Sequence, residues 1–522
     1  MPNDNKYHKL GAEDFGDRIK PGMDLLEMEK SSLADSGEIE ATADIDRIEQ
    51  KMSRTISEAA MEQKSEHQKK VAHVEGFNNT NTEKKTGVEK TADTKKAVVR
   101  RNSTSKTVFK VFGMLFGIVV LVVMAYGLRI WLAYNGFLDK VTGGDPETKE
   151  YSVVVLANSN TNEIHELERK NIGFLETDPK AGNAEQHLQS VVKFEASFYD
   201  SLGTLASVLN DKISDAVTIE SNWLQALEDE SKDAMKDTRV IYTFEIKLDE
   251  DIEISSKDVT KEPFVVLLSG TDSRAGVKAT ARSDVNIVGV VNPEKAKILL
   301  VSIPRDTYVQ LHGTTGLKDK LTHAGVYGVN MSKNTIEDFL GIQIDDTVKV
   351  SFDTVVKVVD QLDGITIDSD QEMSLKPEGK KDKTCHYIVG KQEVDGDCAL
   401  RFARERKSYT TGDRHRGENQ QQVITAIIDK LAHSKNYVLK LPAILDIAAD
   451  SFETSMSKDA ISSLIRMQLI DNPNWKVESI AIDGTGTMLP TYSMGANLPL
   501  YVMIPSDETI VNAQNKITEY LK

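Results

Sequence analysis

The sequence predicts a membrane-anchored α/β protein. Its largest domain is predicted to be a mixed-sheet α/β/α sandwich, preceded by a small α+β domain and a single transmembrane helix. Residues 111–128 form an uncharged apolar run long enough to span a bilayer as a helix. From residue 264 onward, strand-like segments alternate with helix-like ones. The 522 residues include 64 Lys and Arg against 81 Asp and Glu, and this net charge of −17 argues against a nucleic-acid-binding protein.

The first 106 residues are predicted to be a mostly disordered tail. Their only aromatic residues are Tyr7, Phe15 and Phe77. The apolar surface that such a segment can bury is too small to offset the entropy of ordering the chain.

Residues 107–134 are predicted to be the transmembrane anchor. Its apolar core, VFGMLFGIVVLVVMAYGL at 111–128, rises about 27 Å as a helix, which is close to the hydrocarbon thickness of a bilayer. Six Lys and Arg residues lie between 95 and 110, whereas acidic residues follow the run at 145, 147 and 150. The positive-inside rule therefore places the tail in the cytoplasm and the rest of the chain outside the cell.

Beyond the anchor, residues 147–257 are predicted to form the small α+β domain. Apolar runs of strand length lie at 151–156 and 240–246. Between them, apolar residues three and four apart predict that 184–230 is mostly helical.

The larger domain is predicted to span residues 258–522. The turn at 292–294 contains a proline and joins two strands as a hairpin. Asp353 is predicted to cap the start of one helix and Gly341 to end another. The predicted strands are 264–269, 285–291, 298–303, 347–352 and 365–368, and the predicted helices are 335–340, 354–362 and 420–433.

Four short motifs place charged side chains near predicted strand ends. They are GTDSR at 270–274, RSD at 282–284, PRD at 304–306 and the longer ALRFARERKSYTTGDRHRGENQQQ at 399–422. The last motif concentrates five arginines in an acidic region: Arg401, Arg404, Arg406, Arg414 and Arg416. Taken singly, each motif also has an ordinary structural explanation, such as a turn, a surface ion pair or a solvated basic face.

Together, the four motifs suit phosphate chemistry. Asp272, Asp284 and Asp306 supply carboxylates, and Mg²⁺ is commonly held by a few carboxylates and the substrate's phosphate. Arginine presents a planar fork that matches phosphate oxygens. The sequence holds no Walker loop, so the phosphate donor need not be a nucleotide. A lipid-linked phosphate donor suits an anchored domain outside the cell.

These motifs resemble those of the LytR-CpsA-Psr family of Gram-positive cell-wall proteins. The resembling segments run in one order from about residue 262 to residue 430: LLSGTDSR, ARSDVNIVGVVNP, ILLVSIPRDTYV, LTHAGVYG and DCALRFARERKSYTTGDRHRGENQQQVI. The preceding segment, including DTRVIYTFEIKL, resembles the accessory domain of streptococcal-type members. The resemblance does not cover the tail.

The resemblance implies a phosphotransferase that depends on Mg²⁺ or Mn²⁺. Such enzymes move a glycopolymer, either wall teichoic acid or capsular polysaccharide, from an undecaprenyl-pyrophosphate carrier to peptidoglycan, forming a phosphodiester. It also implies a single-pass protein of the cell membrane with its catalytic domain outside. No nucleic-acid partner is expected.

By family motif, the implied site residues fall into groups. The metal-linked carboxylates are Asp272 and Asp284. The catalytic set is Arg282, Asp284 and Arg404. The pyrophosphate-binding set is Arg305, Arg406, Arg416 and Gln420. Four further residues lie in the same motifs with less defined roles: Arg274, Asp306, Asp413 and Arg414.

Two other functions remain open from the sequence. One is a non-catalytic regulator or binding module of the cell envelope, and the other is a pyrophosphatase that acts on the same lipid-linked polymer with water as the acceptor. Both would use the same donor site, so the motifs do not separate them from a transferase.

The chain's two cysteines, Cys385 and Cys398, both lie on the predicted outer side, where oxidation is favoured. We hypothesise that they form a disulfide. The alternative is two free cysteines, because the geometry that a disulfide requires is strict.

Overall fold

The computed structural model describes residues 124–142, 147–231, 233–248, 255–271, 279–377, 383–410, 412–433, 437–449 and 452–522. The predicted tail, 1–106, and the first part of the predicted anchor, 107–123, lie outside the described residues. Residues 124–141 form a helix. Among the described helices, none is both apolar and long enough to cross a membrane.

The end of the 124–141 helix packs against the folded part of the chain. Phe137, Leu138 and Val141 are buried against Leu445 and Ala449 of α12 (Tyr437–Ala449). Apolar contacts therefore join the helix that contains the last residues of the predicted anchor to the predicted larger domain, 258–522.

A five-stranded sheet has the order β3-β2-β4-β1-β5. Strands β2, β3 and β4 are parallel, and β1 runs antiparallel to both β4 and β5. The strands are β1 (Thr148–Leu156), β2 (Asn171–Leu175), β3 (Glu195–Tyr199), β4 (Ala216–Glu220) and β5 (Thr238–Lys247). The helices beside it are η2 (Ile164–Leu167), α4 (Ala181–Val191), α5 (Leu202–Asn210) and α6 (Ser221–Glu230).

The strands predicted at 151–156 and 240–246 are confirmed as β1 and β5, but the prediction that 184–230 is mostly helical was wrong in part. Strands β3 and β4 interrupt that stretch. Each strand has five residues, EASFY and AVTIE, which is too short to show a period distinct from that of the helices on either side.

The main sheet has six strands in the order β16-β11-β6-β7-β8-β17. Strands β6, β8, β11 and β17 run in one direction, and β7 and β16 run in the other. The carboxyl ends of β6, β8 and β11 therefore meet the start of β7 at one edge. The strands are β6 (Phe264–Thr271), β7 (Val285–Asn292), β8 (Lys297–Ser302), β11 (Asp346–Ser351), β16 (Phe452–Thr454) and β17 (Lys476–Ala481).

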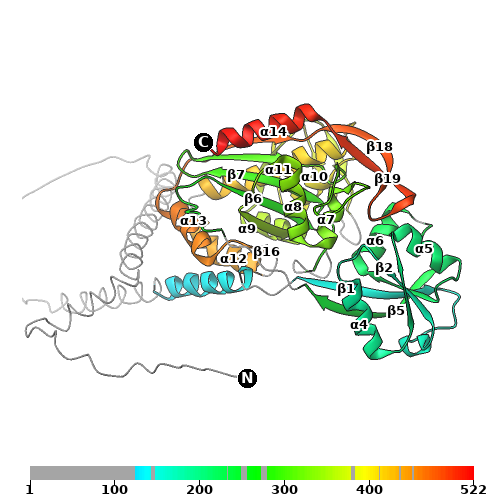
Figure 1. Ribbon diagram of the computed structural model, residues 1–522. Coiled ribbons are helices and arrows are strands. Elements are labelled where there is room, and N and C mark those ends of the chain that lie inside the picture. The colour runs from blue at the N-terminus through cyan, green and yellow to red at the C-terminus, as the bar shows by residue number, and fades with distance from the viewer. Residues whose placement is uncertain are drawn as a thin grey trace, which may run out of the picture. The chain divides into compact units, whose positions relative to one another are not determined.

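Helices cover both faces of this sheet (Figure 1). On one face, Leu299 and Val301 of β8 pack in a core with Ile517 of α14 (Asp507–Tyr520). On the other face, α11 (Asp413–His433) lies against β8, because a Cβ at Gly417 of this helix would be 2.9 Å from the side-chain hydroxyl of Ser302, the residue after Val301. Successive residues of a strand face opposite sides of the sheet. The predicted mixed-sheet α/β architecture is thus confirmed.

Smaller elements complete the part of the fold that the structure describes. The other helices of that part are α7 (Leu321–Tyr327), α8 (Val329–Leu340), α9 (Phe352–Gln361), α10 (Gly396–Arg404) and α13 (Lys458–Ile470). Four two-stranded sheets pair β9 (Tyr308–Val309) with β10 (Asp319–Lys320), β12 (Ile365–Ser369) with β15 (Gly390–Val394), β13 (Met373–Leu375) with β14 (Cys385–Tyr387), and β18 (Gly484–Thr491) with β19 (Gly495–Pro505).

Most predictions for this part are confirmed, with two corrections. The predicted hairpin is β7 and β8, and Gly341 ends α8 in a left-handed conformation with φ of 64°. Asp353 does not cap α9, which begins at Phe352, two residues before the predicted start, with Ser351 at the N-cap position. The strand predicted at 365–368 forms, but it pairs with β15 and not with the main sheet.

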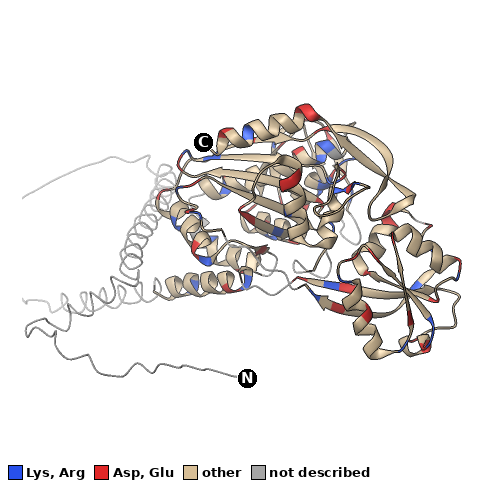
Figure 2. Ribbon diagram, in the orientation of Figure 1, with Lys and Arg blue, Asp and Glu red and all other residues tan. Residues whose placement is uncertain are grey.

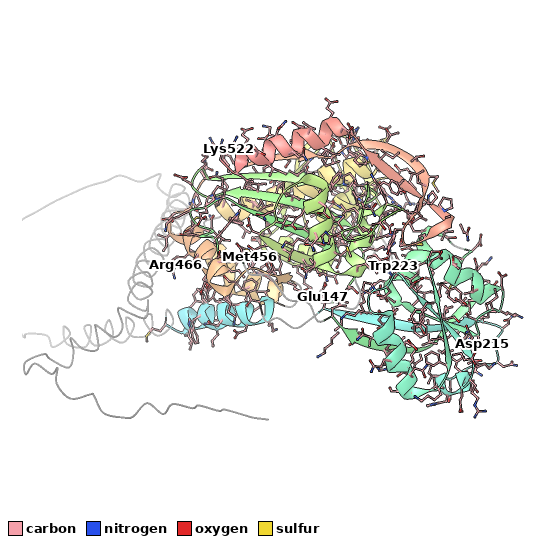
Figure 3. All side chains as sticks on the ribbon, in the orientation of Figure 1. Glu147, Asp215, Trp223, Met456, Arg466 and Lys522 are labelled. Carbon is pink, nitrogen blue, oxygen red and sulfur yellow. A yellow bond between two sulfur atoms is a disulfide. The ribbon has the colours of Figure 1, made fainter. Side chains whose placement is uncertain are left out.

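A shared hydrophobic core connects the five-stranded sheet to the elements near the main sheet. Trp223 of α6, labelled in Figure 3, packs edge-on against His323 and Tyr327 of α7. Leu311 and Met494 belong to the same buried cluster. This core fixes α6 beside the segment that leads into α7. The predicted domain boundaries stay predictions.

Candidate functional site

Described residues of three charged motifs, 282–284, 304–306 and 399–422, lie at the edge of the main sheet where β6, β8 and β11 end and β7 begins. In the register of the sheet, Gly270 of β6 pairs with Val285 of β7, and Ile287 of β7 pairs with Ser302 of β8. The motif at 282–284 and the motif at 304–306 flank these positions. Figure 2 marks the basic and acidic residues on the ribbon. Side chains at the carboxyl edge of an α/β sheet are well placed to bind ligands.

Asp284 and Arg305 form the central ion pair of this edge. The Nη1 of Arg305 donates to Oδ1 of Asp284 at 2.9 Å, and each side chain is 18% exposed. The backbone N–H of Asp284 donates to the carbonyl oxygen of Gly270 at 3.0 Å. The hydroxyl of Thr322 lies 3.4 Å from the same Oδ1. A hydrogen bond therefore fixes the backbone at Asp284, and the side chains of both Asp284 and Arg305 remain partly exposed to solvent.

Asp306 lies next to this pair and is almost fully buried. Its Oδ2 is 3.8 Å from Nε of Arg305, and its Oδ1 is 2.9 Å from Nζ of Lys320. Burial acts to raise the pKa of Asp306, but the positive charges of Lys320, Arg305 and Arg416 outweigh burial and hold that pKa below its ordinary value. Asp306 is therefore a carboxylate that works as a counter-charge for the cations around it.

Arg416 and Gln420 lie in the first turns of α11, and both are buried. Gly417 places this helix against β8: a Cβ at Gly417 would lie 2.9 Å from the hydroxyl of Ser302. The close approach explains the glycine, and it brings Arg416 within electrostatic reach of Asp306.

Arg404 is the last residue of α10, and its side chain is exposed. Its guanidinium lies over the ring of Phe352, 5.3 Å from the ring centre. Phe352 in turn borders the end of β6, because a Cβ at Gly270 would lie 3.3 Å from the phenylalanine ring. Arg404 thus stands beside the end of β6. Arg406 follows α10 and is also exposed.

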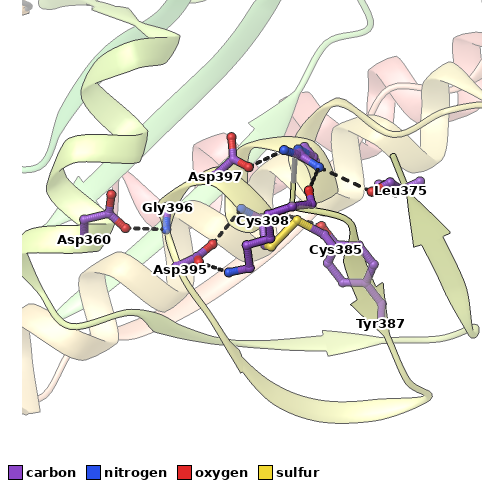
Figure 4. The surroundings of a disulfide bond; sticks show 10 residues. Asp360, Leu375, Cys385, Tyr387, Asp395, Gly396, Asp397 and Cys398 are labelled. Atoms are coloured by element: carbon purple, nitrogen blue, oxygen red, sulfur yellow. Dashed lines mark hydrogen bonds and ion pairs between the residues drawn. A yellow bond between two sulfur atoms is a disulfide. The ribbon is translucent and has the colours of Figure 1, made fainter. Parts of the chain in front are cut away.

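A disulfide supports the start of α10 (Figure 4). Cys385 of β14 is bonded to Cys398 of α10. Asp395 caps the helix by accepting from the backbone N–H of Cys398 at 3.0 Å. The hydroxyl of Tyr387 donates to the carbonyl oxygen of Cys398 at 2.7 Å. The helix that presents Arg404 is therefore held at its opposite end by a covalent bond and a cap.

Two arginines of the same stretch have partners elsewhere. Arg401 pairs with Asp397 and donates to the carbonyl oxygen of Lys383, so it supports the disulfide region. Arg414 pairs with Asp483, and both of these side chains are partly exposed.

Arg282 contacts a residue that precedes the main sheet in the sequence. Its Nη2 lies 2.5 Å from Oδ2 of Asp229, near the end of α6. The side chain of Arg282 is 16% exposed and that of Asp229 is 53% exposed. The sequence motifs did not indicate this contact.

Three of the predicted site residues are not placed. Asp272 and Arg274 lie outside the described residues, and the side chain of Asp413 is not described. Within the described part of the chain, no three His, Cys, Asp or Glu side chains cluster closely enough to hold a metal ion. Asp284 supplies an oxygen ligand of the kind that Mg²⁺ prefers, and the predicted second carboxylate belongs to the segment that is not described.

Sequence reasoning missed Lys320, Glu230 and Asp229. Lys320 directly precedes the LTHAGVYG motif, which is the only local signal for it. Nothing in the sequence around Asp229 or Glu230 distinguishes them from other acidic residues at a helix end, because their partners are far away along the chain.

Comparison with known proteins gives the following matches. The model of the LytR_cpsA_psr family matches residues 218–504. The polyisoprenyl-teichoic acid–peptidoglycan teichoic acid transferase TagU of Halalkalibacterium halodurans is 32% identical over 280 residues, which cover 53% of this chain and 84% of the relative. TagV of Bacillus subtilis, a transferase of the same description, is 32% identical over 236 residues, covering 44% of this chain and 59% of the relative. The crystal structure of B. subtilis TagV is 29% identical, with a TM-score of 0.42, over 50% of this chain and 98% of that one.

Proposed function

The chain belongs to the LytR_cpsA_psr family, and we propose that it transfers a polyisoprenyl-linked glycopolymer to peptidoglycan as a transferase enzyme. Relatives that match it are named for the transfer of teichoic acid from a polyisoprenyl carrier to peptidoglycan. Wall teichoic acid is therefore the first polymer to test, and capsular polysaccharide is the second.

One observation carries the proposal: Asp284, Arg305, Asp306 and Arg416, which are spread along the sequence, converge on the same edge of the main sheet. A pyrophosphate bound at this edge would meet several guanidinium groups, whose fork geometry suits its oxygens. Arg305, Arg406, Arg416 and Gln420 are proposed to bind it, and Arg282 and Arg404 to stabilise the charge that grows as the bond breaks.

In the proposed reaction, an acceptor hydroxyl of peptidoglycan attacks the phosphorus that carries the glycopolymer. A new P–O bond forms, the P–O bond to the bridging oxygen breaks, polyprenyl phosphate leaves, and the hydroxyl proton passes to a base or to water. Asp284 and Asp272 are proposed to hold Mg²⁺ or Mn²⁺, which would neutralise pyrophosphate charge. This chain's arginines orient the phosphates and supply the remaining positive charge.

The proposed location is the cell membrane, with the N-terminus in the cytoplasm and the catalytic domain outside. The Lys and Arg residues before the apolar run support this orientation. The Cys385–Cys398 disulfide also supports an outer location, because disulfides persist in oxidising compartments.

A three-way assay tests the function. The full chain in detergent or vesicles is given the lipid-linked polymer with and without peptidoglycan. Polymer joined to peptidoglycan by a phosphodiester, formed only when both substrates are present, supports the transferase. Release of polymer phosphate without peptidoglycan would instead indicate a pyrophosphatase, and binding without turnover would indicate a binding module.

A matched pair of arginine variants controls this assay. Arg305→Lys should reduce transfer, because an ammonium group cannot reproduce the bidentate fork. Arg239→Lys is the control, since Arg239 donates to the carbonyl oxygens of Ser159 and Thr161 beside the five-stranded sheet. Equal transfer by both variants would contradict the assignment of the site.

A further inference from the structure

Four charged side chains connect α6 to the candidate site. The Nζ of Lys320 lies 2.8 Å from Oε1 of Glu230, the last residue of α6, and 2.9 Å from Oδ1 of Asp306. Asp306 in turn lies 3.8 Å from Nε of Arg305. Charges of alternating sign therefore run from Glu230 through Lys320 and Asp306 to Arg305.

The members of this chain of charges are shielded from water. The side chain of Lys320 is 3% exposed, that of Asp306 is 8% and that of Glu230 is 16%. A charge at such a depth is costly unless an opposite charge or a hydrogen bond compensates it. Lys320 is the cation shared by the two carboxylates, so the geometry of each carboxylate depends on it.

The backbone around Lys320 is also fixed against the motif at 304–306. The N–H of Leu321 donates to the carbonyl oxygen of Thr307 at 2.9 Å, and the N–H of Thr322 donates to that of Arg305 at 2.9 Å. The N–H of Lys320 itself donates to Oδ1 of Asp319 at 2.8 Å. The lysine therefore sits on a segment that is hydrogen-bonded to the residues it positions.

We propose that Lys320 is a positioning residue for the transfer reaction: it holds Asp306, and through Asp306 the guanidinium of Arg305, while Glu230 of α6 holds Lys320. The inference rests on the proposed function. It implies that α6, through Glu230, helps to position the charged residues of the site. Catalytic groups must be held within a fraction of an ångström, because a displacement of about 1 Å can lower a rate about a hundredfold.

Charge alone and positioning predict opposite effects for Glu230→Gln. Removing a carboxylate makes the region more positive, so a pure charge effect would strengthen the binding of an anion. If Glu230 positions Lys320, its loss loosens Asp306 and Arg305, and binding weakens. Glu228→Gln is the matched control, because Glu228 is an exposed residue of the same helix and the substitution changes the charge equally.

The experiment titrates the full chain with inorganic pyrophosphate by calorimetry and measures polymer transfer alongside thermal unfolding. Glu230→Gln should bind pyrophosphate about threefold to tenfold more weakly than Glu228→Gln, and should transfer about tenfold more slowly, at a temperature where thermal unfolding shows that both variants are folded. Lys320→Met should be at least as impaired. Adding Glu230→Gln to Lys320→Met should cause no further loss, because the two residues act in series.

Pyrophosphate binding by Glu230→Gln that is as tight as by Glu228→Gln, or tighter, would overturn the inference. So would additive losses in the double variant. If Lys320→Met does not fold, the comparison of the two glutamate variants still decides. If the binding order is as expected but the unsubstituted chain transfers no polymer, the positioning role stands and the proposed function fails.

Discussion

Arg305 and Asp284 join the end of β8 to the start of β7 through a hydrogen bond of 2.9 Å between Nη1 and Oδ1. Asp284 directly precedes β7 and Arg305 follows β8, and these two strands are antiparallel. In the sequence the two residues belong to separate motifs. Their pairing produces a site in which an arginine already has a carboxylate partner before a phosphate arrives. A bound pyrophosphate must therefore share Arg305 with Asp284.

Replacing Asp229 by Asn is expected to strengthen anion binding. Asp229 holds Nη2 of Arg282 at 2.5 Å, and its own side chain is about half exposed. Without that carboxylate, Arg282 is free to turn toward a pyrophosphate. Titration of the full chain with inorganic pyrophosphate should show a dissociation constant about twofold to fivefold lower, in line with the modest value of an exposed ion pair. Asp233→Asn, a change of equal charge after α6, is the control.

This outcome is the reverse of that expected for Glu230→Gln, although the two acidic residues are adjacent. Weakened pyrophosphate binding by Asp229→Asn would mean that Asp229 orients Arg282 and does not compete for it.

The stability of the protein should fall as the pH rises through the range where Glu220 ionises. Burial raises the pKa of Glu220 to about 7, and the positive charge of Lys149 only partly offsets this. In the unfolded chain the group titrates near its ordinary value, so between about pH 4.5 and pH 7 the folded state binds more protons than the unfolded state. The free energy of unfolding should therefore decrease by about 3 kcal/mol across this window and level off above it.

Glu220→Gln should remove that decrease. The variant should unfold at a higher temperature than the unsubstituted chain at pH 8 and show no such advantage at pH 4.5, whereas Glu228→Gln should show no difference in slope. A parallel dependence of unfolding temperature on pH in the Glu220→Gln variant would show that another group is responsible.

Loss of the disulfide should lower both stability and transfer. The bond joins residues 13 apart in sequence, and a loop of about that size contributes about 3 kcal/mol in the loop-entropy model. Because it anchors the helix that ends at Arg404, replacing both cysteines by serine should also slow transfer. Denaturant unfolding of the double variant measures the first effect. Thiol labelling of the unreduced, denatured protein checks the bond itself, since two reactive thiols would exclude it.

The centre of the main sheet could be predicted because β6, β7 and β8 contain apolar runs of strand length, whereas β16 (FET) and β17 (KVESIA) contain none and were not predicted. FVVLLS and ILLVS are buried on both faces, so their composition alone indicates their place. The strand at 365–368 was also recognised, but its partner was not. Strand pairing depends on segments that meet only in the folded chain. The partner of β12 is β15, which begins about 25 residues later in the sequence. Within 184–230, β3 and β4 are too short to show the alternation of apolar and polar residues that would distinguish a strand from the neighbouring helices.

For the site, too, the local sequence identified individual residues but not the contacts between distant ones. Asp284, Arg305, Asp306 and Arg416 could be named because each lies in a motif with several charges. Lys320 and Glu230 could not, because the contact between them spans 90 residues and involves a lysine and a glutamate of ordinary local sequence. Arg401 belonged to the arginine-rich motif, yet its contacts support the disulfide region. A local pattern indicates which residues are unusual, and the folded chain decides which of them meet.

The central claim is that the charged edge of the main sheet is a phosphotransfer site, and polymer transfer by full-length Asp284→Ala and Arg404→Lys tests it most directly. Both variants should unfold near the temperature of the unsubstituted chain and should transfer polymer to peptidoglycan about a hundredfold more slowly or worse, because Asp284→Ala removes a carboxylate proposed to hold the metal ion and Arg404→Lys removes the planar guanidinium that is proposed to stabilise the transition state. Arg404→Lys keeps the charge, so its defect would show that the shape of the guanidinium matters. Normal transfer by either well-folded variant would contradict the claim.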